Sequence, residues 1–123
     1  MSSPSATLTL HLHPRADDKT AVLSLAGRLD AFTQTQAEEG IARQLDAVPG
    51  GALRLILDCS ALEFVSSAGL RVLLTAVRRL KPAGGQVILC APRPAVRHLI
   101  ELSGMGNLLR TCDTLEQALH SPA

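Results

Sequence analysis

The apolar positions of this chain recur with two periods, which predict strands and helices in turn. Between Thr7 and His13, leucines alternate with polar residues, which is the period of a half-buried strand. Residues 21–25 are apolar again, and the short polar connection before them favours an antiparallel hairpin. Residues 53–57 and 86–90 are apolar without alternation, which is typical of parallel strands buried on both faces.

Four other segments carry apolar residues at helical spacing. They run from an N-cap at Thr33 to about Val48, over 68–81, from Pro92 and Pro94 to Gly104, and onward from an N-cap at Thr114. A short edge strand is predicted at 108–111, and the GRLD segment at 27–30 is expected to leave the sheet.

The order of these elements predicts one α/β domain over residues 1–123. Its sheet is expected to be mixed and mostly parallel, with four to five strands and about four helices. The first hairpin adds the antiparallel edge. Residues 1–6 are small and polar and are expected to be disordered.

The tract from Leu53 to Leu74 joins a buried strand to an amphipathic helix through two adjacent serines. The strand is expected to end near Asp58, and a short loop then leads to Ser66 and Ser67. Ser67 lies at or beside the first free N–H groups of a helix, which attract negative charge and tolerate a phosphate. On the residues alone two interpretations stay open: one serine simply caps the helix, or its hydroxyl accepts a phosphoryl group.

Composition and charge argue against several classes of function. The chain is 46% hydrophobic but 2% aromatic, without Trp or Tyr, so it lacks the stacking platforms that bind single-stranded nucleic acid. Its net charge of +1 gives no electrostatic footprint for DNA, and we expect no nucleic-acid partner. Apolar stretches are too short for a membrane span, and the three separated cysteines are typical of reduced thiols. We therefore expect a cytoplasmic protein without membrane insertion.

The candidate catalytic and metal-binding residues form no known constellation. His11 and His13 share a strand face, but no third ligand is placed beside them, and solvent-facing positions are the favoured interpretation. Ser67 lacks a GxSxG context and an identified partner histidine, which makes a hydrolase a weak hypothesis. Cys59 is expected to be a buried, unreactive thiol. The sequence predicts no catalytic residue, no metal and no cofactor.

Three segments, in order, resemble the signature of STAS domains, named after sulphate transporters and anti-sigma factor antagonists. In the main segment, DCSALEFVSSAGLRVLL, the matching positions are Asp58, Ser60, Phe64, Val65, Ser66, Ser67, Gly69 and Leu70. GRLDAFT at 27–33 resembles the family's G-x-L-D-x-x-T segment, and residues 84–109 resemble its glycine- and proline-containing region. The resemblance covers nearly the whole chain and implies the STAS fold.

The resemblance also implies a partner switch. In soluble bacterial members, the unphosphorylated antagonist binds an anti-sigma factor that is also a serine kinase of the ATP-binding type. Phosphorylation of a serine at the start of the second helix releases the antagonist, and a PP2C-like phosphatase resets it. By position, Ser67 matches this serine, Ser66 is a backup acceptor, and Asp30 matches an acidic residue near it. The chain would be a substrate and not an enzyme, and a monomer or weak dimer.

The expected docking surface is formed by the Asp30 to Thr33 loop, the 59–67 loop and the exposed side of helix 68–81, and it includes the surroundings of the phosphosite. The residues assigned to them are Asp30, Thr33, Asp58, Ser60, Ser66, Gly69 and Arg71. The chain departs from the best-known antagonists at Ser66, where they have Asp, and at Ala68, where they have a second Ser. The alternative hypothesis is a non-phosphorylated STAS subunit of a lipid-transport ATPase or a signalling scaffold.

Overall fold

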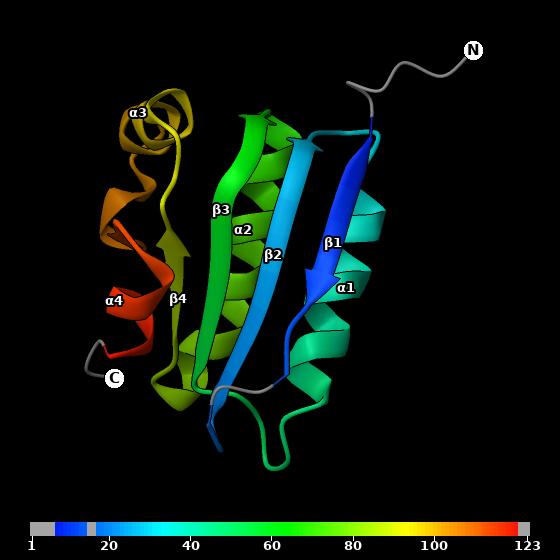
Figure 1. Ribbon diagram of the computed structural model, residues 1–123, viewed down its shortest axis with the longest axis vertical. Coiled ribbons are helices and arrows are strands. Elements are labelled where there is room, and N and C mark those ends of the chain that lie inside the picture. The colour runs from blue at the N-terminus through cyan, green and yellow to red at the C-terminus, as the bar shows by residue number, and fades with distance from the viewer. Residues whose placement is uncertain (1–6, 15–16, 121–123) are drawn as a thin grey trace.

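The fold is built on one five-stranded sheet in the order β1-β2-β3-β4-β5 (Figure 1). The structure is a computed structural model that describes residues 7–14 and 17–120. The strands are β1 (Leu8–Leu12), β2 (Thr20–Leu29), β3 (Arg54–Val65), β4 (Gln86–Cys90) and β5 (Leu109–Cys112). β1 runs antiparallel to β2 and all other neighbours are parallel, which confirms the predicted mixed sheet. The expected disorder of residues 1–6 lies outside the described residues.

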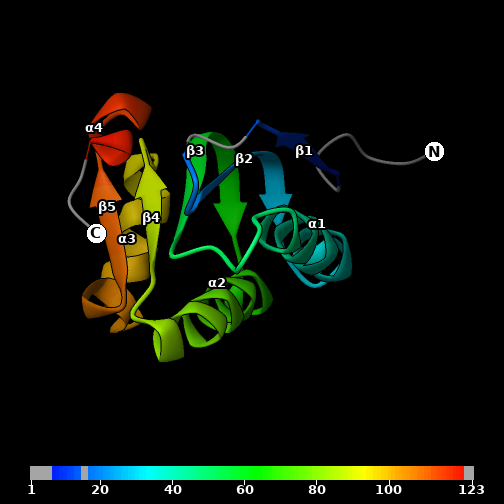
Figure 2. The same cartoon turned by 90° about the horizontal axis from the view of Figure 1, so that it is seen from below.

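Helices cover the two faces of the sheet unequally. They are α1 (Gln34–Asp46), α2 (Ser67–Leu80), α3 (Pro94–Leu102) and α4 (Leu115–Leu119), with single 3-10 turns at Lys81–Ala83 and Met105–Asn107. Figure 2 shows α1 and α2 on one face and α4 on the other. Part of the second face is therefore left open beside α4.

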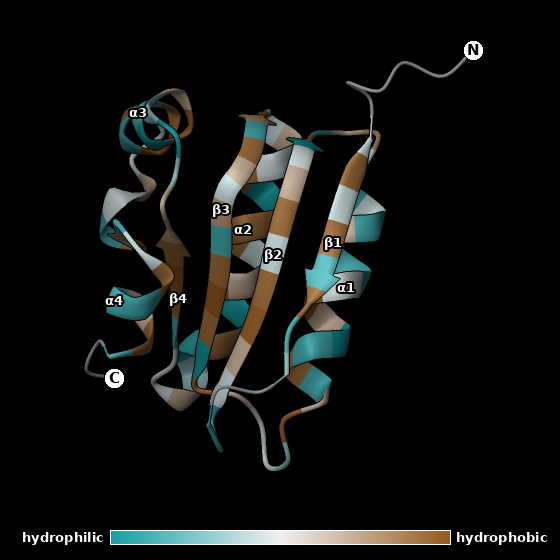
Figure 3. Cartoon of the chain, in the orientation of Figure 1, coloured by the Kyte–Doolittle hydropathy of each residue, from teal (hydrophilic) through white to brown (hydrophobic). Residues whose placement is uncertain are grey.

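The interior is aliphatic, as the composition predicts. The main core packs one face of the sheet against α1, α2 and α3; its fully buried members include Leu23, Leu25, Leu55, Leu57, Leu73 and Leu89. A smaller cluster lies on the opposite face beneath α4, and consists of Val22, Ile56, Ile88, Cys90 and Ala118. Figure 3 shows the apolar colouring concentrated along β2, β3 and β4. Within the described ranges, no helix combines the length and the apolar character needed to cross a membrane.

Two strands are longer than the sequence predicts, and this corrects the expected path of the chain. The GRLD segment stays in the sheet, because β2 continues to Leu29 and pairs there with Val65. Residues 59–65 are likewise strand and not loop. β4 ends at Cys90, opposite Asp58, so the second half of β3 pairs with β2 alone. That half therefore contains both exposed and buried residues. Its pattern does not continue the apolar run of residues 53–57.

Arg54, at the start of β3, ties the C-terminal helix to the sheet. Its side chain is buried, with a residue exposure of 8%, and its Nε donates to Thr20 Oγ1 at 3.2 Å. Its two terminal nitrogens donate to the carbonyl oxygens of Ala118 (3.4 Å) and Leu119 (3.5 Å). The Arg54 side chain also forms an ion pair with Asp17 at 3.3 Å. These bonds hold the last turn of a helix that is too short to be stable alone.

Replacing Arg54 with methionine should lower the free energy of unfolding by about 2 kcal/mol, because charge-assisted hydrogen bonds to two carbonyls are lost. Urea unfolding followed by circular dichroism measures this change. Arg79→Met is the matched control, since Arg79 pairs with Asp46 on an exposed surface and should cost less than about 1 kcal/mol. Equal costs for the two variants would contradict the role given to Arg54.

Candidate functional site

The two adjacent serines occupy different positions at the junction of β3 and α2. Ser66 is the N-cap of α2, and its Oγ accepts a hydrogen bond from the Gly69 N–H at 3.3 Å. Its own N–H donates to the Leu29 carbonyl at 3.0 Å, which fixes the turn against the end of β2. Ser66 is half-buried, whereas Ser67 is the first residue of the helix and is exposed.

The Ser67 hydroxyl has no hydrogen-bond partner among the described residues, while the Ser66 hydroxyl is engaged in capping. The backbone N–H groups of the first helical turn have no acceptor within the helix, and the partial positive charge of the helix lies at this end. Of the two serines, Ser67 therefore offers the accessible hydroxyl, in a position that favours added negative charge. An Asp at position 66 would cap the helix in the same way as Ser66, because both are preferred N-cap residues.

Gly69 allows the helix to start this close to the sheet. A Cβ at Gly69 would lie 2.3 Å from the Leu29 carbonyl oxygen and 2.9 Å from a methyl group of Val65. Real Cβ atoms do not come so near to backbone oxygen. Gly69 therefore sets the distance between α2 and the end of β2. It also sets the position of Ser66 and Ser67, which we call the serine turn.

The neighbouring turn, Asp30 to Thr33, is fixed by its own hydrogen bonds. Asp30 is 8% exposed, and its Oδ1 accepts from the N–H groups of Phe32 (3.0 Å) and Thr33 (3.2 Å). Arg28 donates to the other carboxylate oxygen at 3.4 Å. Asp30 directly follows Leu29, whose carbonyl accepts from the Ser66 N–H, so this turn lies beside the serines.

Thr33 has a different role from the predicted cap. It stands at the N-cap position of α1, but its hydroxyl makes no cap hydrogen bond. Instead its Oγ1 accepts from the Asp30 N–H at 3.0 Å and donates to the Arg28 carbonyl at 2.8 Å. The hydroxyl therefore closes the turn together with the Asp30 carboxylate, which accepts the Thr33 N–H.

Asp58 and Ser60 lie away from the serine turn, since β3 carries them seven and five residues before Val65 in one continuous strand. The Asp58 carboxylate accepts from Ser24 Oγ at 3.4 Å and from the Ser60 N–H at 3.1 Å. His13, which follows β1, has its Nε2 2.6 Å from the same Ser24 Oγ, so these residues form a polar network that joins the end of β1 to β2 and β3. They stabilise the open face of the sheet and do not surround Ser67.

The imidazole of His11 packs edge-on against that of His13, with ring centroids 4.5 Å apart. Across residues 7–14 and 17–120, no three His, Cys, Asp or Glu side chains gather as a metal site would require. The network is also not arranged as a catalytic triad, because the serine stands between the histidine and the carboxylate.

The cysteines are free, and two of them are buried. Burial is the main cause that raises the pKa of the Cys59 thiol, and burial with smaller effects of Cys112 and Asp58 raises the pKa of Cys90 to about 12. Because the thiolate is the reactive form, both groups are unreactive near neutral pH. The expectation of a buried Cys59 is confirmed.

In the native protein, Ellman's reagent at about pH 8 should titrate only Cys112, which is half-buried. In denaturant all three thiols should react, because Cys59 and Cys90 become exposed and their raised pKa values return to the range of about 8.5. Cys112→Ser should remove the native signal. Rapid reaction of a second thiol in the folded protein would contradict the burial of Cys59 and Cys90.

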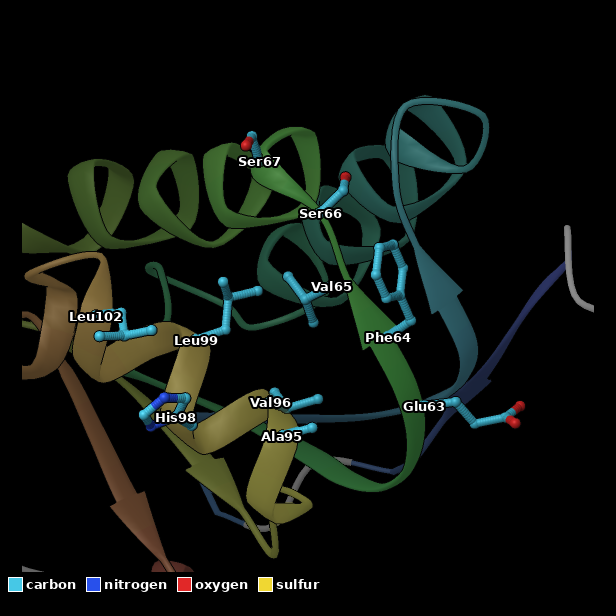
Figure 4. A pocket seen from close by; sticks show the side chains of 10 residues that line it. All are labelled: Glu63, Phe64, Val65, Ser66, Ser67, Ala95, Val96, His98, Leu99 and Leu102. Carbon is cyan, nitrogen blue, oxygen red and sulfur yellow. The ribbon is translucent and has the colours of Figure 1, made fainter.

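An apolar groove of about 530 Å³ lies beside the serine turn. Figure 4 shows Phe64 on one side of it and Leu99 and Leu102 of α3 on the other, with Ser66 and Ser67 at the rim. The docking surface expected from the sequence contains Phe64 within its 59–67 loop but does not include α3.

Arg71 lies one turn beyond Ser67 on α2 and is exposed. The structure thus groups Asp30, Thr33, Ser66, Ser67, Gly69 and Arg71 at one end of the sheet. It leaves Asp58 and Ser60 on the open face.

Several known proteins are similar to this chain in sequence and fold. The family model "STAS domain" matches residues 11–118. The chain is 33% identical to BtrV of Bordetella bronchiseptica, over 82% of this chain and 84% of that protein. It is 32% identical to the anti-sigma-F factor antagonist RsfB of Mycobacterium tuberculosis, over 97% of this chain and 92% of that protein.

Solved structures of the anti-sigma factor antagonist SpoIIAA have the same fold. The unphosphorylated form is 28% identical, with a TM-score of 0.75 over 90% of this chain and 93% of that chain. The phosphorylated Bacillus form is 27% identical, with a TM-score of 0.68 over 90% and 96%. With the matched family model and the predicted topology, these findings show that the chain belongs to the STAS domain family.

Proposed function

We propose that this chain is an anti-sigma factor antagonist that is controlled by phosphorylation of Ser67. In its unphosphorylated form it binds an anti-sigma factor that is also a serine kinase of the ATP-binding type. A PP2C-like phosphatase restores the free hydroxyl. The chain is the substrate of these reactions and is not itself an enzyme. The names of RsfB and SpoIIAA as antagonists, and the solved phosphorylated form of SpoIIAA, support this role.

The observation that carries the proposal is the exposed, unpartnered Ser67 hydroxyl at the first position of α2, among the described residues. In the transfer, a bond forms between Ser67 Oγ and the γ-phosphorus of ATP. The bond from that phosphorus to the bridging oxygen of ADP breaks, and the hydroxyl proton is lost. Asp30 is committed to its own turn, so the base for this proton belongs to the kinase.

A phosphate on Ser67 changes the surface and leaves the fold intact. It adds about −1.5 to −2 charges, and the helix N-terminus stabilises negative charge by about 0.3–1 kcal/mol. The Ser66 cap and the Gly69 contact remain, because neither uses the Ser67 hydroxyl. The added charge would instead be desolvated when a partner covers it, which weakens docking.

The proposal is tested with the purified chain, its kinase and ATP. Before ATP is added, the two proteins should co-elute in size-exclusion chromatography; after ATP, one phosphate should appear on the chain and the complex should separate. Phosphopeptide mapping then locates the phosphate. A complex that persists without any phosphate transfer, or copurification with a membrane-transport ATPase, would favour the non-phosphorylated STAS subunit instead.

A further inference from the structure

A second cavity, of about 590 Å³, lies at the end of α2 that is farther from the serine turn. Figure 2 shows the end of α2 beside the starts of β4 and β5, and these three elements contribute to its walls. The helix has 14 residues, so its two ends lie about 20 Å apart. The cavity is therefore separate from the groove beside Ser67, and its volume is large enough for a small metabolite.

The polar part of the lining is basic. Lys81 and Arg110 contribute two positive charges, and Gln86 and Asn107 contribute amide groups that can donate hydrogen bonds. Among the described residues, no Asp or Glu lines this cavity. The whole chain has a net charge of only +1, so the cavity holds a local excess of positive charge. Such a cavity attracts an anion.

Other cavities of the described chain have a different balance of charge. The groove beside the serine turn includes Glu63, and two cavities that border α1 both include Glu39. In each of these an acidic side chain opposes an anionic ligand. Lys81 is exposed and forms no ion pair within the described ranges, so its ammonium group is available to a ligand.

Backbone hydrogen bonds hold the walls of the cavity in place. The Gln86 N–H donates to the Leu53 carbonyl at 2.9 Å, which fixes the start of β4. On the other wall, the Leu108 N–H donates to the Met105 carbonyl at 2.9 Å, just before β5. Little conformational entropy is lost when a ligand binds to walls that are already fixed.

Gly106 leaves open space at this cavity. It belongs to the lining, and no atom lies within 4 Å of a Cβ added to it. Its φ is outside the left-handed region, so the backbone there accepts a larger residue. Apolar side chains complete the lining; they are Val77, Val87, Leu108 and Leu109. The cavity thus combines basic groups for an anion with an apolar wall for an organic body.

We propose that this cavity binds the phosphate group of a small metabolite, with Lys81 and Arg110 as its cationic partners. Phosphate monoesters carry nearly two negative charges near neutral pH and three strong acceptor oxygens, which match two cations and the amides of Gln86 and Asn107. A carboxylate would leave one of the cations uncompensated. Inorganic phosphate shares this chemistry, but the apolar wall favours an ester. This site is independent of phosphate transfer to Ser67.

The test is a titration of the isotope-labelled chain, followed by the backbone amide shifts in NMR spectra. Ribose phosphate is the probe, inorganic phosphate is the second ligand, and ribose is the uncharged control. Saturable shifts should gather at residues 85–87 and 106–110, and added salt should weaken binding. Tighter binding of ribose phosphate supports an ester, and equal affinities would assign the site to free phosphate. Equal binding of ribose, or shifts confined to residues 67–70, would overturn the proposal.

Variants test the basic lining directly. Lys81→Met should raise the dissociation constant of ribose phosphate by at least about tenfold, because a charge-assisted hydrogen bond is lost. Arg43→Met is the matched control, since Arg43 is also an exposed cation but lines a different cavity, beside Glu39. Gly106→Glu should abolish binding, because a carboxylate fits the open space and repels phosphate. An unchanged dissociation constant in Lys81→Met, or binding that persists in Gly106→Glu, would contradict the assignment. Equal urea midpoints show that the variants are folded.

Discussion

A Ser67→Ala chain is expected to take up no phosphate and to remain bound to its kinase after ATP is added. The reason is geometric, since Ser67 offers the one exposed hydroxyl of the serine turn and Ser66 uses its oxygen to cap α2. The variant should fold as the wild type does, because the Ser67 hydroxyl makes no hydrogen bond within the described part of the chain. Phosphate transfer from labelled ATP and size-exclusion chromatography of the mixture measure the two effects.

Ser66→Ala is the matched control for this prediction. It removes the N-cap hydrogen bond and should lower the free energy of unfolding by about 1 kcal/mol. Phosphate should still be incorporated at Ser67, more slowly if the first turn of the helix frays. Full incorporation into Ser67→Ala would move the acceptor to Ser66 or elsewhere, and would remove the central support for the proposed switch.

The serine turn could be located from the sequence because its signals are local. Two N-cap residues stand directly before an apolar stripe with helical spacing, and the helix begins there, at Ser67. The apolar run at 86–90 likewise coincides with β4, and the run at 53–57 falls within β3 except for its first residue. The prediction of a loop was wrong for the second half of β3, residues 59–65. The burial pattern of that half depends on the neighbouring strand β4, which ends early.

The surroundings of Ser67 could not be predicted in the same way. Asp58 belongs to the same motif as Ser67, yet the extended strand carries it away and the pleat turns it toward Ser24. Phe64 falls in the expected 59–67 loop, but the structure places it in β3, where it is 39% exposed. The burial of Arg54 also depends on α4, which lies far along the chain.

Replacing Gly69 with alanine should destabilise the protein, although helix propensity alone predicts the opposite. In a helix interior, alanine is favoured over glycine by about 0.8–1.0 kcal/mol. At Gly69 the added Cβ would meet the Leu29 carbonyl oxygen at 2.3 Å and Val65 at 2.9 Å. Relieving this contact requires α2 to move from the end of β2, and such overpacking costs about 1–3 kcal/mol.

The net change in the free energy of unfolding for Gly69→Ala is therefore a loss of up to about 2 kcal/mol, measured by urea unfolding and circular dichroism because the chain has no Trp. Gly106→Ala is the control, since no atom lies within 4 Å of its added Cβ, and it should be nearly neutral. A displaced helix start would also move the Ser66–Ser67 turn, so phosphate transfer to Ser67 should slow in Gly69→Ala and not in Gly106→Ala. Stabilisation by Gly69→Ala would show that propensity outweighs the contact with Leu29, and that the helix start can shift without cost.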